Sequence, residues 1–413
     1  MEFFQYMPLG QARERVAASL AGIVPGYEAV DLPDALGRVA AADITAGEDL
    51  PPFSRSSVDG FAVRSADTFG AGEAVPVLLA ITGEIAMGEQ AAGALQPGQA
   101  VAVPTGGMLP PGADAVVMLE HTDRPDADTL LVLHVAAPGE NVVARGEDIA
   151  AGAVILAAGQ RIAPQHIGIL AACGHGRVPV REKPAVAVIS SGDELVDIHQ
   201  TPAGGQIRDI NSYALGAMLT AAGCRVERLG IVKDNYEDFL AVLKKAVAAC
   251  RLVVISGGSS VGARDYTVRA IGSLGSPGVL IHGIAVKPGR PTVFGMVGNV
   301  PVFGLPGHPV AAMTVCEQLV KPAVRALLGQ VAGGPCAVPA AVSRSVASAP
   351  GRDDFVNVRL GKQQGQYTAE PILGKSGLIS TIAQADGVIH IPADKSGLYS
   401  GETVEVLVIK TAE

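Results

Sequence analysis

The sequence predicts a multidomain protein of the α/β plus β class, in which an α/β domain with a mostly parallel sheet is flanked by two small β domains. The 413 residues are enough for two to four domains of ordinary size. Between 185 and 320, buried apolar runs alternate with helical patterns. Before and after this segment, apolar runs are short and broken by glycine and proline, which is typical of β domains.

The N-terminal part is predicted to begin as a helix and to continue as β structure. Leu9, Val16 and Leu20 recur at helical spacing, which predicts an amphipathic helix over 9–21. Short strands are then predicted at VPVLLAI (75–81), QAVAVPTG (99–106), DAVVML (114–119) and LLVLHV (130–135). A short helix is expected after Pro164.

The central part predicts βαβ units. Its strands are AVAVIS (185–190), VERLGIV (226–232) and LVVIS (252–256). Asn211 is a candidate cap for the helix after the first strand, and Asn235 with Asp238 resembles a capping box for the next. From 330 onward, strands such as DFVNVRL (354–360) and ETVEVLVI (402–409) predict the second β domain.

Charge and composition exclude several function classes. The net charge of −9 argues against nonspecific binding of nucleic acid or of an anionic membrane, although it allows a local anion pocket. The five cysteines have no close pair, so we expect buried reduced thiols and neither a zinc knuckle nor a redox pair. No signal pattern or membrane-length apolar stretch occurs, so we expect a cytoplasmic protein without membrane contact.

Polar, glycine-rich loops follow the strands of the predicted α/β domain. They are SSGDE (190–194), VKDN (232–235), SGGSSVGARDY (256–266) and GLPGHP (304–309). Because ligands bind beyond the carboxyl ends of parallel strands, we expect Asp193, Glu194, Asp234 and Asp265 on one rim. Lys287 and Arg290 join them if their loop faces the same way.

Carboxylates beside cations and glycine amides suit an anionic, phosphorylated small ligand with Mg²⁺. Ordinary turns are the competing interpretation of each loop. Pro309 is placed to start a helix whose positive end faces the rim. A Walker loop and a GxGxxG dinucleotide fingerprint are missing from the sequence. A nucleophilic triad has no support, because the eight histidines are scattered along the chain.

Motifs along nearly the whole chain carry a more specific resemblance. They are PPFSRSSVDGFAVR (51–64), PTGGMLPPGADAVV (104–117), RGEDI (145–149), SSGDEL (190–195), GQIRDINSY (205–213), SGGSSVGARDYT (256–267), KPGRP (287–291), GLPGHP (304–309), PGRDDF (350–355) and SGLIS with ADG (376–387). In these motifs the sequence resembles the molybdopterin molybdenumtransferase family (MoeA), whose architecture is shared by the E-domain of gephyrin.

The resemblance implies an elongated homodimer of four-domain subunits. It assigns 1–26 plus 179–328 to a three-layer α/β molybdopterin-binding domain and 27–50 plus 145–178 to an α+β linker domain. Residues 51–144 would form a β-rich domain, and 329–413 a β-barrel-like domain.

The resemblance also implies a reaction. Adenylyl-molybdopterin and molybdate (or tungstate) would react with Mg²⁺ to release AMP and give molybdenum cofactor, with the substrate delivered by transient contact with a molybdopterin adenylyltransferase. The alternatives are a non-catalytic gephyrin-like scaffold and a Mg²⁺-dependent nucleotide pyrophosphatase on the same α/β domain.

Site roles carry over residue by residue. The resemblance assigns Asp193, Glu194, Asp265, Asp59 and Asp148 to catalysis, with Glu194 and Asp265 as Mg²⁺ ligands. It assigns ligand binding to Thr105, Ser190, Gly192, Ser256, Gly257, Gly258, Ser259, Lys287, Arg290, Pro291, Gly307, His308, Pro309, Arg352 and Ser376. Asp59, Thr105 and Asp148 would act across the dimer.

Some of these residues have simpler interpretations. Asp59 and Asp148 also fit turn or cap positions, and Ser376 fits a plain turn hydroxyl. The sequence departs from the family pattern at His308, where Asn is usual, and this histidine would titrate near neutral pH.

Overall fold

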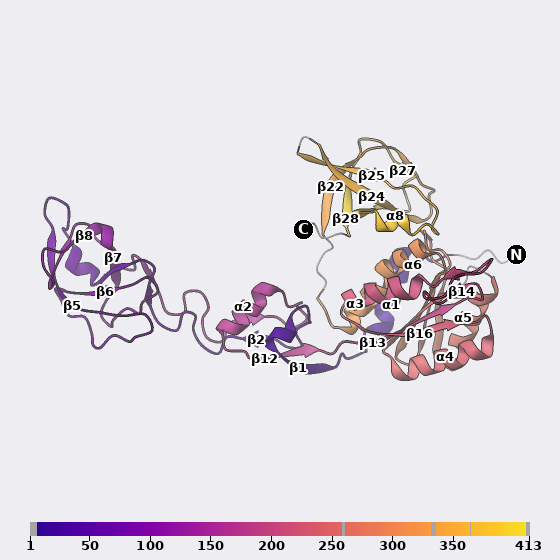
Figure 1. The fold of residues 1–413 in the computed structure, drawn as a ribbon, viewed down its shortest axis with the longest axis horizontal. Coiled ribbons are helices and arrows are strands. Elements are labelled where there is room, and N and C mark those ends of the chain that lie inside the picture. Colours follow the sequence, from indigo (N-terminus) through magenta and orange to yellow (C-terminus); the bar gives the residue numbers. More distant parts are fainter. Residues whose placement is uncertain (1–5, 258–260, 332–335, 364, 410–413) are drawn as a thin grey trace.

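The computed structural model describes residues 6–409 apart from 258–260, 332–335 and 364. Its shape is elongated (Figure 1). The β domain that carries β5–β8 lies at one end, the small linker with β1, β2, β12 and α2 lies in the middle, and the α/β domain and the C-terminal barrel lie together at the other end.

The α/β domain is built on a six-stranded sheet of order β16-β13-β17-β21-β20-β18. Its strands are β13 (Ala185–Ser191), β16 (Arg225–Val232), β17 (Leu252–Gly257), β18 (Pro277–His282), β20 (Val293–Val297) and β21 (Val300–Pro306). The first four in sheet order run parallel, and β20 runs antiparallel to both of its neighbours, β21 and β18. The edge strand β18 therefore has the same direction as the first four strands. The prediction of a mostly parallel sheet is therefore confirmed.

Helices cover both faces of this sheet, as the continuous apolar runs of its central strands predict. The helices are α1 (Leu9–Leu20), α3 (Asn211–Ala221), α4 (Tyr236–Ala249), α5 (Val261–Leu274), α6 (Pro309–Val315) and α7 (Lys321–Leu327). Val186 and Val188 pack toward α1, α3 and α7, whereas Ala187 and Ile189 pack toward α4 and α5. The three-layer arrangement follows from this alternation.

Of the two helix caps predicted in this domain, the one at Asn235 is confirmed and the one at Asn211 is wrong. The Asn235 side chain accepts hydrogen bonds from the backbone N–H groups of Glu237 and Asp238, as predicted. The prediction for Asn211 is wrong, because Asn211 is already inside the helix. The carboxylate of Asp209 accepts from the N–H of Ser212 instead, at 3.1 Å.

The helix that begins at Pro309 extends beyond the predicted end near 320. A π-helical turn (Cys316–Val320) joins α6 to α7. Pro322 explains the wider turn, because proline lacks an N–H and clashes with the carbonyl four residues earlier in a regular α-helix. The chain therefore continues as a helix to Leu327.

The C-terminal domain is a closed barrel, as its strand pairings show. Its strands are β22 (Ala337–Val342), β24 (Asp353–Gln363), β25 (Gln366–Pro371), β26 (Gly387–Ile391) and β28 (Thr403–Val408). They pair in the order β24-β25-β22-β28-β26, and β26 pairs back to β24. The short elements are β23 (Val346–Ala347), β27 (Gly397–Leu398) and α8 (Ser380–Ala383). The expected barrel-like domain is confirmed.

One short strand of the α/β domain joins this barrel. Strand β19 (Val286–Lys287) pairs in parallel with β24, with Val286 opposite Asp353 and Lys287 opposite Asp354. This backbone pairing fixes the barrel over the loops beyond the sheet.

The N-terminal β domain has a six-stranded sheet of order β7-β4-β6-β5-β9-β8. Its strands are β4 (Gly60–Val63), β5 (Val77–Glu84), β6 (Gln99–Val103), β7 (Ala115–Met118), β8 (Thr122–Asp123) and β9 (Thr129–Val132), with β3 (Arg55–Ser56) and β10 (Val142–Val143) as a separate pair. The four predicted strands of this segment are present.

The linker pairs β1 (Tyr27–Asp31) with β12 (Arg177–Arg181), and β2 (Ile44–Thr45) with β11 (Val154–Leu156), beside α2 (Pro164–Ala172). Strand β12 crosses the predicted boundary at 178–179, and the four domain ranges stay predictions.

No helix among the described residues is long and apolar enough to cross a membrane. Four cysteines are buried, but Cys336 is exposed, so the expectation of buried thiols is wrong there.

Candidate functional site

A cavity of about 740 Å³ lies between the α/β domain and the C-terminal barrel. This volume is in the range of small-molecule sites. Eight of the residues assigned to ligand binding line it, from both domains: Gly257, Lys287, Arg290, Pro291, Gly307, His308, Arg352 and Ser376. The loop after β19 and the loop before α6 therefore do meet the C-terminal domain.

Basic side chains dominate the polar lining of this cavity. Lys287 ends β19 and Arg290 lies in the loop that follows it, whereas Arg352 and Lys375 come from the C-terminal domain. Asp354 is the single carboxylate among the described lining residues. Four cations against one anion give the cavity a positive potential, which favours an anionic ligand.

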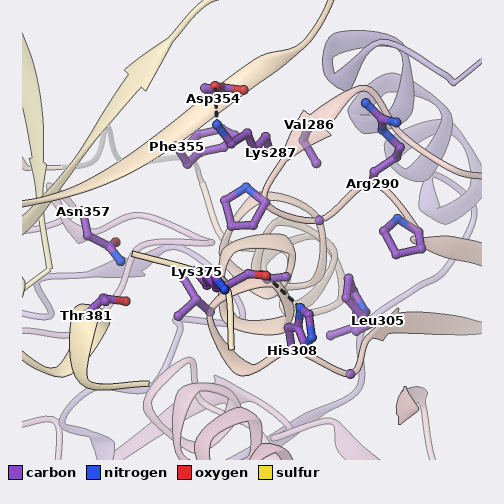
Figure 2. A pocket seen from close by; sticks show the side chains of 18 of the residues that line it. Val286, Lys287, Arg290, Leu305, His308, Asp354, Phe355, Asn357, Lys375 and Thr381 are labelled. Carbon is purple, nitrogen blue, oxygen red and sulfur yellow. Dashed lines mark hydrogen bonds and ion pairs between the residues drawn. The ribbon is translucent and has the colours of Figure 1, made fainter. Parts of the chain in front are cut away.

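Asp354 joins two of these cations. Its Oδ1 accepts a hydrogen bond from Nε of Arg352 at 2.9 Å, and its Oδ2 lies 3.6 Å from Nζ of Lys287. Figure 2 shows Lys287 reaching this carboxylate above the cavity. The pairing of β19 with β24 places Lys287 and Asp354 opposite each other, so the contact is set by backbone register.

His308 and Ser376 connect the two walls of the cavity. Nδ1 of His308 lies 2.8 Å from Oγ of Ser376, the contact drawn as a dashed line at His308 in Figure 2. The backbone N–H of Val310 also donates to the carbonyl of Ser376, at 3.1 Å. Pro309 is the first residue of α6, as predicted. The histidine that departs from the family pattern therefore makes a specific contact across the domain junction.

The carboxylate rim lies at the ends of β13 and β16, outside the cavity lining. Oδ1 of Asp193 accepts from the N–H of Asp234 at 3.2 Å, and Oγ of Ser191 donates to Oδ1 of Asp234 at 3.2 Å. Glu194 folds back so that a Cβ on Gly192 would lie 2.6 Å from its Oε2. Asp193 and Asp234 therefore do meet at this edge, with Glu194 directly after Asp193 in the chain, whereas the predicted place of Asp265 on the same rim stays a prediction.

Buried polar contacts hold the strand ends beneath the rim. Oγ of Ser190 donates to Oδ1 of Asp209 at 2.9 Å. Nδ2 of Asn211 donates at 2.7 Å to both Oγ of Ser256 and the carbonyl of Gly307. The side chains of Ser190 and Ser256 thus support the loops from inside, because both residues are buried and both hydroxyls are used in these contacts.

Three predicted residues are only partly covered by the structure. Gly258 and Ser259 lie outside the described residues. Asp265 lies on α5, but its side chain is outside the described part. Gly257 ends β17 so close to Ser191 that an added Cβ would lie 3.2 Å from the Ser191 Cβ.

Asp59, Thr105 and Asp148 are not brought to the cavity within one chain. Asp59 precedes β4 and Thr105 follows β6, both in the β domain at the far end of the molecule (Figure 1), whereas Asp148 lies between β10 and β11, where that domain joins the linker. Oδ1 of Asp59 accepts from the N–H of Thr105 at 2.7 Å and from its hydroxyl at 2.9 Å. The backbone donor, followed by the hydroxyl, lowers the pKa of Asp59.

The carboxylates suit Mg²⁺ in chemical type and in number. No group of three metal-ligating side chains occurs among the described residues. Mg²⁺ is commonly bound by one or two carboxylates, with substrate phosphates completing its shell. Glu194 is exposed on the rim, and its carboxylate has no hydrogen bond or ion pair within the described part of the chain. An exposed carboxylate without a protein partner is a suitable oxygen ligand for Mg²⁺.

Two residues of the cavity escaped the sequence analysis. Asp354 lies in PGRDDF, two residues after Arg352, and Lys375 directly precedes Ser376. The only sequence feature that could have pointed to these two residues is that each lies next to, or two positions from, a residue that was predicted. Neither role follows from spacing, because each depends on how the barrel docks on the α/β domain.

Comparisons with known proteins agree along the whole chain. Three family models match: "MoeA N-terminal region (domain I and II)" over residues 7–174, "Probable molybdopterin binding domain" over 187–326, and "MoeA C-terminal region (domain IV)" over 339–409.

Curated relatives and solved structures match at nearly full length. The chain is 34% identical to a molybdopterin molybdenumtransferase of Bacillus subtilis, covering 93% of this chain and 90% of the relative. It is 33% identical to molybdopterin molybdenumtransferase 1 of Mycobacterium tuberculosis, covering 95% and 97%. A crystal structure of the molybdopterin biosynthesis MoeA protein of Pyrococcus horikoshii OT3 superposes with a TM-score of 0.86 at 31% identity, covering 98% of this chain and 100% of that one.

Proposed function

The chain belongs to the molybdopterin molybdenumtransferase family, and from this premise we propose that it inserts molybdenum from molybdate into adenylyl-molybdopterin in the cytoplasm. Water cleaves the phosphoanhydride, which releases AMP and leaves the molybdopterin phosphate. The two dithiolene sulfurs form bonds to molybdenum, and one molybdate oxygen leaves as water with the two thiol protons. Molybdenum keeps its oxidation state, so no redox partner is needed.

The observation that carries this proposal is the convergence of basic side chains on one cavity between two domains. Lys287, Arg290 and Arg352 are suited to bind a doubly charged tetraoxoanion, because charge-assisted hydrogen bonds to oxyanions are strong and directional. Ser376 and His308 supply further polar contacts beside them. Tungstate would bind equally well, since it has nearly the same size and charge.

Glu194 and Asp265 would hold Mg²⁺ together with phosphate oxygens of the substrate. When bound there, the ion would neutralise charge on the phosphoanhydride and orient the attacking water. Asp193 would accept or hold a proton at the rim, as carboxylates beside a reacting phosphate commonly do. The buried contacts of Ser190 and Ser256 keep the loops in place for this chemistry.

Asp59, Thr105 and Asp148 would act in the site of a second copy of the chain. Their distance from the cavity within one chain is the reason for this part of the proposal (Figure 1). An elongated subunit can reach its partner's cavity with its far end when two copies pair about a two-fold axis. A transient contact with the adenylyltransferase would deliver the substrate.

The test is AMP release from purified adenylyl-molybdopterin with Mg²⁺, with and without molybdate. We expect molybdate-dependent release by the wild type and its loss in Glu194→Ala. Glu14→Ala, an exposed carboxylate on α1, is the matched control and should behave as the wild type. Bound substrate that stays intact under every condition would contradict the proposed activity.

A further inference from the structure

Asp354 is an unexpected residue in a site for anions. Its side chain is 4% exposed, and it lies at the start of β24 against the cavity. A buried carboxylate repels an incoming oxyanion and costs free energy to bury. It therefore needs a compensating role, and its two contacts suggest what that role is.

Each oxygen of Asp354 holds one cation, and the two cations come from different domains. Arg352 belongs to the C-terminal domain and binds Oδ1, whereas Lys287 belongs to the α/β domain and lies at Oδ2. Two cations converging on one point repel each other. A carboxylate between them offsets that repulsion and gives each side chain a fixed partner.

The exposed fractions of the Lys287 and Arg352 side chains agree with a role of Asp354 between them. The Lys287 side chain is 57% exposed and that of Arg352 is 25% exposed, so both keep surface for a ligand while Asp354 stays covered. Arg352 uses Nε for Asp354, and its two terminal nitrogens make no hydrogen bond or ion pair with the described residues. A guanidinium oriented in this way presents its remaining donors as a fork for an oxyanion.

We infer that Asp354 is a positioning residue for oxyanion binding, which aligns Lys287 and Arg352 across the domain junction. This inference rests on the proposed function for the identity of the anion. It assigns to Asp354 no contact with the anion itself. Asp354 acts through the two cations, and the backbone pairing of β19 with β24 keeps it in register with Lys287.

The experiment is calorimetric titration of the full chain with sodium molybdate and with sodium tungstate. We expect Asp354→Asn to bind both oxyanions about tenfold more weakly or worse, the size expected when charge-assisted hydrogen bonds lose their alignment. Asp353→Asn is the matched control. Asp353 is the adjacent carboxylate, it pairs with His390 at 2.7 Å instead of with a cavity cation, and its variant should bind as the wild type.

If charge alone mattered, Asp354→Asn would change the oxyanion affinity in the opposite direction, so the test separates the two explanations. Removing a negative charge near the anion would strengthen binding, so equal or tighter binding by Asp354→Asn would overturn the inference. If Asp354→Asn does not fold, Arg352→Lys replaces it, because lysine keeps the charge but cannot present the fork that Nε anchors. Wild-type affinity in Arg352→Lys would then overturn the inference, and an affinity as low as that of Arg352→Gln would support it.

The two proposals fail separately. Oxyanion binding that depends on Asp354, without any AMP release, would remove the proposed activity and leave the inference standing. AMP release by the wild type, together with wild-type oxyanion binding by Asp354→Asn, would support the proposed activity and overturn the inference about Asp354. A wild-type chain that binds neither oxyanion overturns the inference directly.

Discussion

Nδ1 of His308 lies 2.8 Å from Oγ of Ser376, and this hydrogen bond connects the loop before α6 to the C-terminal barrel across the cavity. The two residues are 68 positions apart in the chain. Because each orients the other, we expect their contributions to ligand binding to be coupled.

A double-mutant cycle on molybdate affinity measures this coupling. Ser376→Ala and His308→Ala should each weaken binding, and the double variant should bind little worse than either one. The expected coupling is about 0.5–1 kcal/mol, the size of a partly exposed hydrogen bond. Thr381→Ala is the control partner, since Thr381 lines the same cavity but bonds to the Leu378 carbonyl. If the losses of molybdate affinity in the two single variants simply add in the double variant, the His308–Ser376 hydrogen bond does not contribute to molybdate binding.

Thr105→Val should raise the pKa of Asp59. The backbone N–H of Thr105, the larger cause, remains in the variant, so the pKa should rise only part of the way to the usual aspartate range. A lowered folded-state pKa stabilises the fold above the unfolded pKa, and this stabilisation is lost as pH falls through the folded value. The variant should therefore gain less stability from Asp59 above the unfolded pKa, and the loss of that stability on acidification should be complete at a higher pH.

Titration of the Asp59 carboxyl carbon by NMR checks this prediction. Thr122→Val is the matched control, because its hydroxyl bonds to the Leu119 carbonyl in the same domain. An unchanged Asp59 titration in Thr105→Val would mean that the hydroxyl contact is not formed in solution.

Gly192→Ala should disturb the carboxylate rim, both by contact with Glu194 and by the backbone strain that an alanine meets at a φ of 155°. An added Cβ would lie 2.6 Å from Oε2 of Glu194, so the flexible glutamate must move away. If Glu194 serves the phosphoanhydride, AMP release should fall by about tenfold or more, since small displacements of catalytic groups are costly. Gly275→Ala is the control, because Gly275 has the same φ of 155° and a Cβ there would have its nearest contact at 3.7 Å, an ordinary van der Waals distance. Wild-type turnover by Gly192→Ala would argue that the position of Glu194 is unimportant.

Mixed dimers should reveal whether Asp59 acts across the subunit boundary. Asp59→Asn and Glu194→Ala chains, each inactive alone, should regain about a quarter of wild-type AMP release when unfolded together and refolded at equal amounts, because random pairing leaves that share of composite sites intact. Mixing Asp59→Asn with Thr105→Val should restore nothing, since both changes lie on the same domain. No recovery in the first mixture would place Asp59 and Glu194 in the same chain's site, or in unrelated sites.

Local patterns in the sequence were sufficient for the α/β domain. Parallel strands carry their carboxyl ends to one edge, so the order of strand and loop alone predicts that Asp193, Glu194 and Asp234 meet there. The cap at Asn235 follows from the same local rules. Local pattern failed at Asn211, where a tertiary contact with Ser256 and Gly307 replaced the cap.

The cavity was beyond any local pattern. Its walls come from two domains, and Asp354 meets Lys287 because β19 leaves its own domain to pair with the barrel. Likewise, Asp59 and Thr105 are in contact, and the elongated arrangement of the domains separates the β domain that carries them from the cavity (Figure 1). The sequence by itself determined the strands, the loops and the chemistry of their side chains, because periodicity and turn residues act over a few positions. The tertiary structure decided which of those side chains share one site, because that depends on packing between segments far apart in the chain.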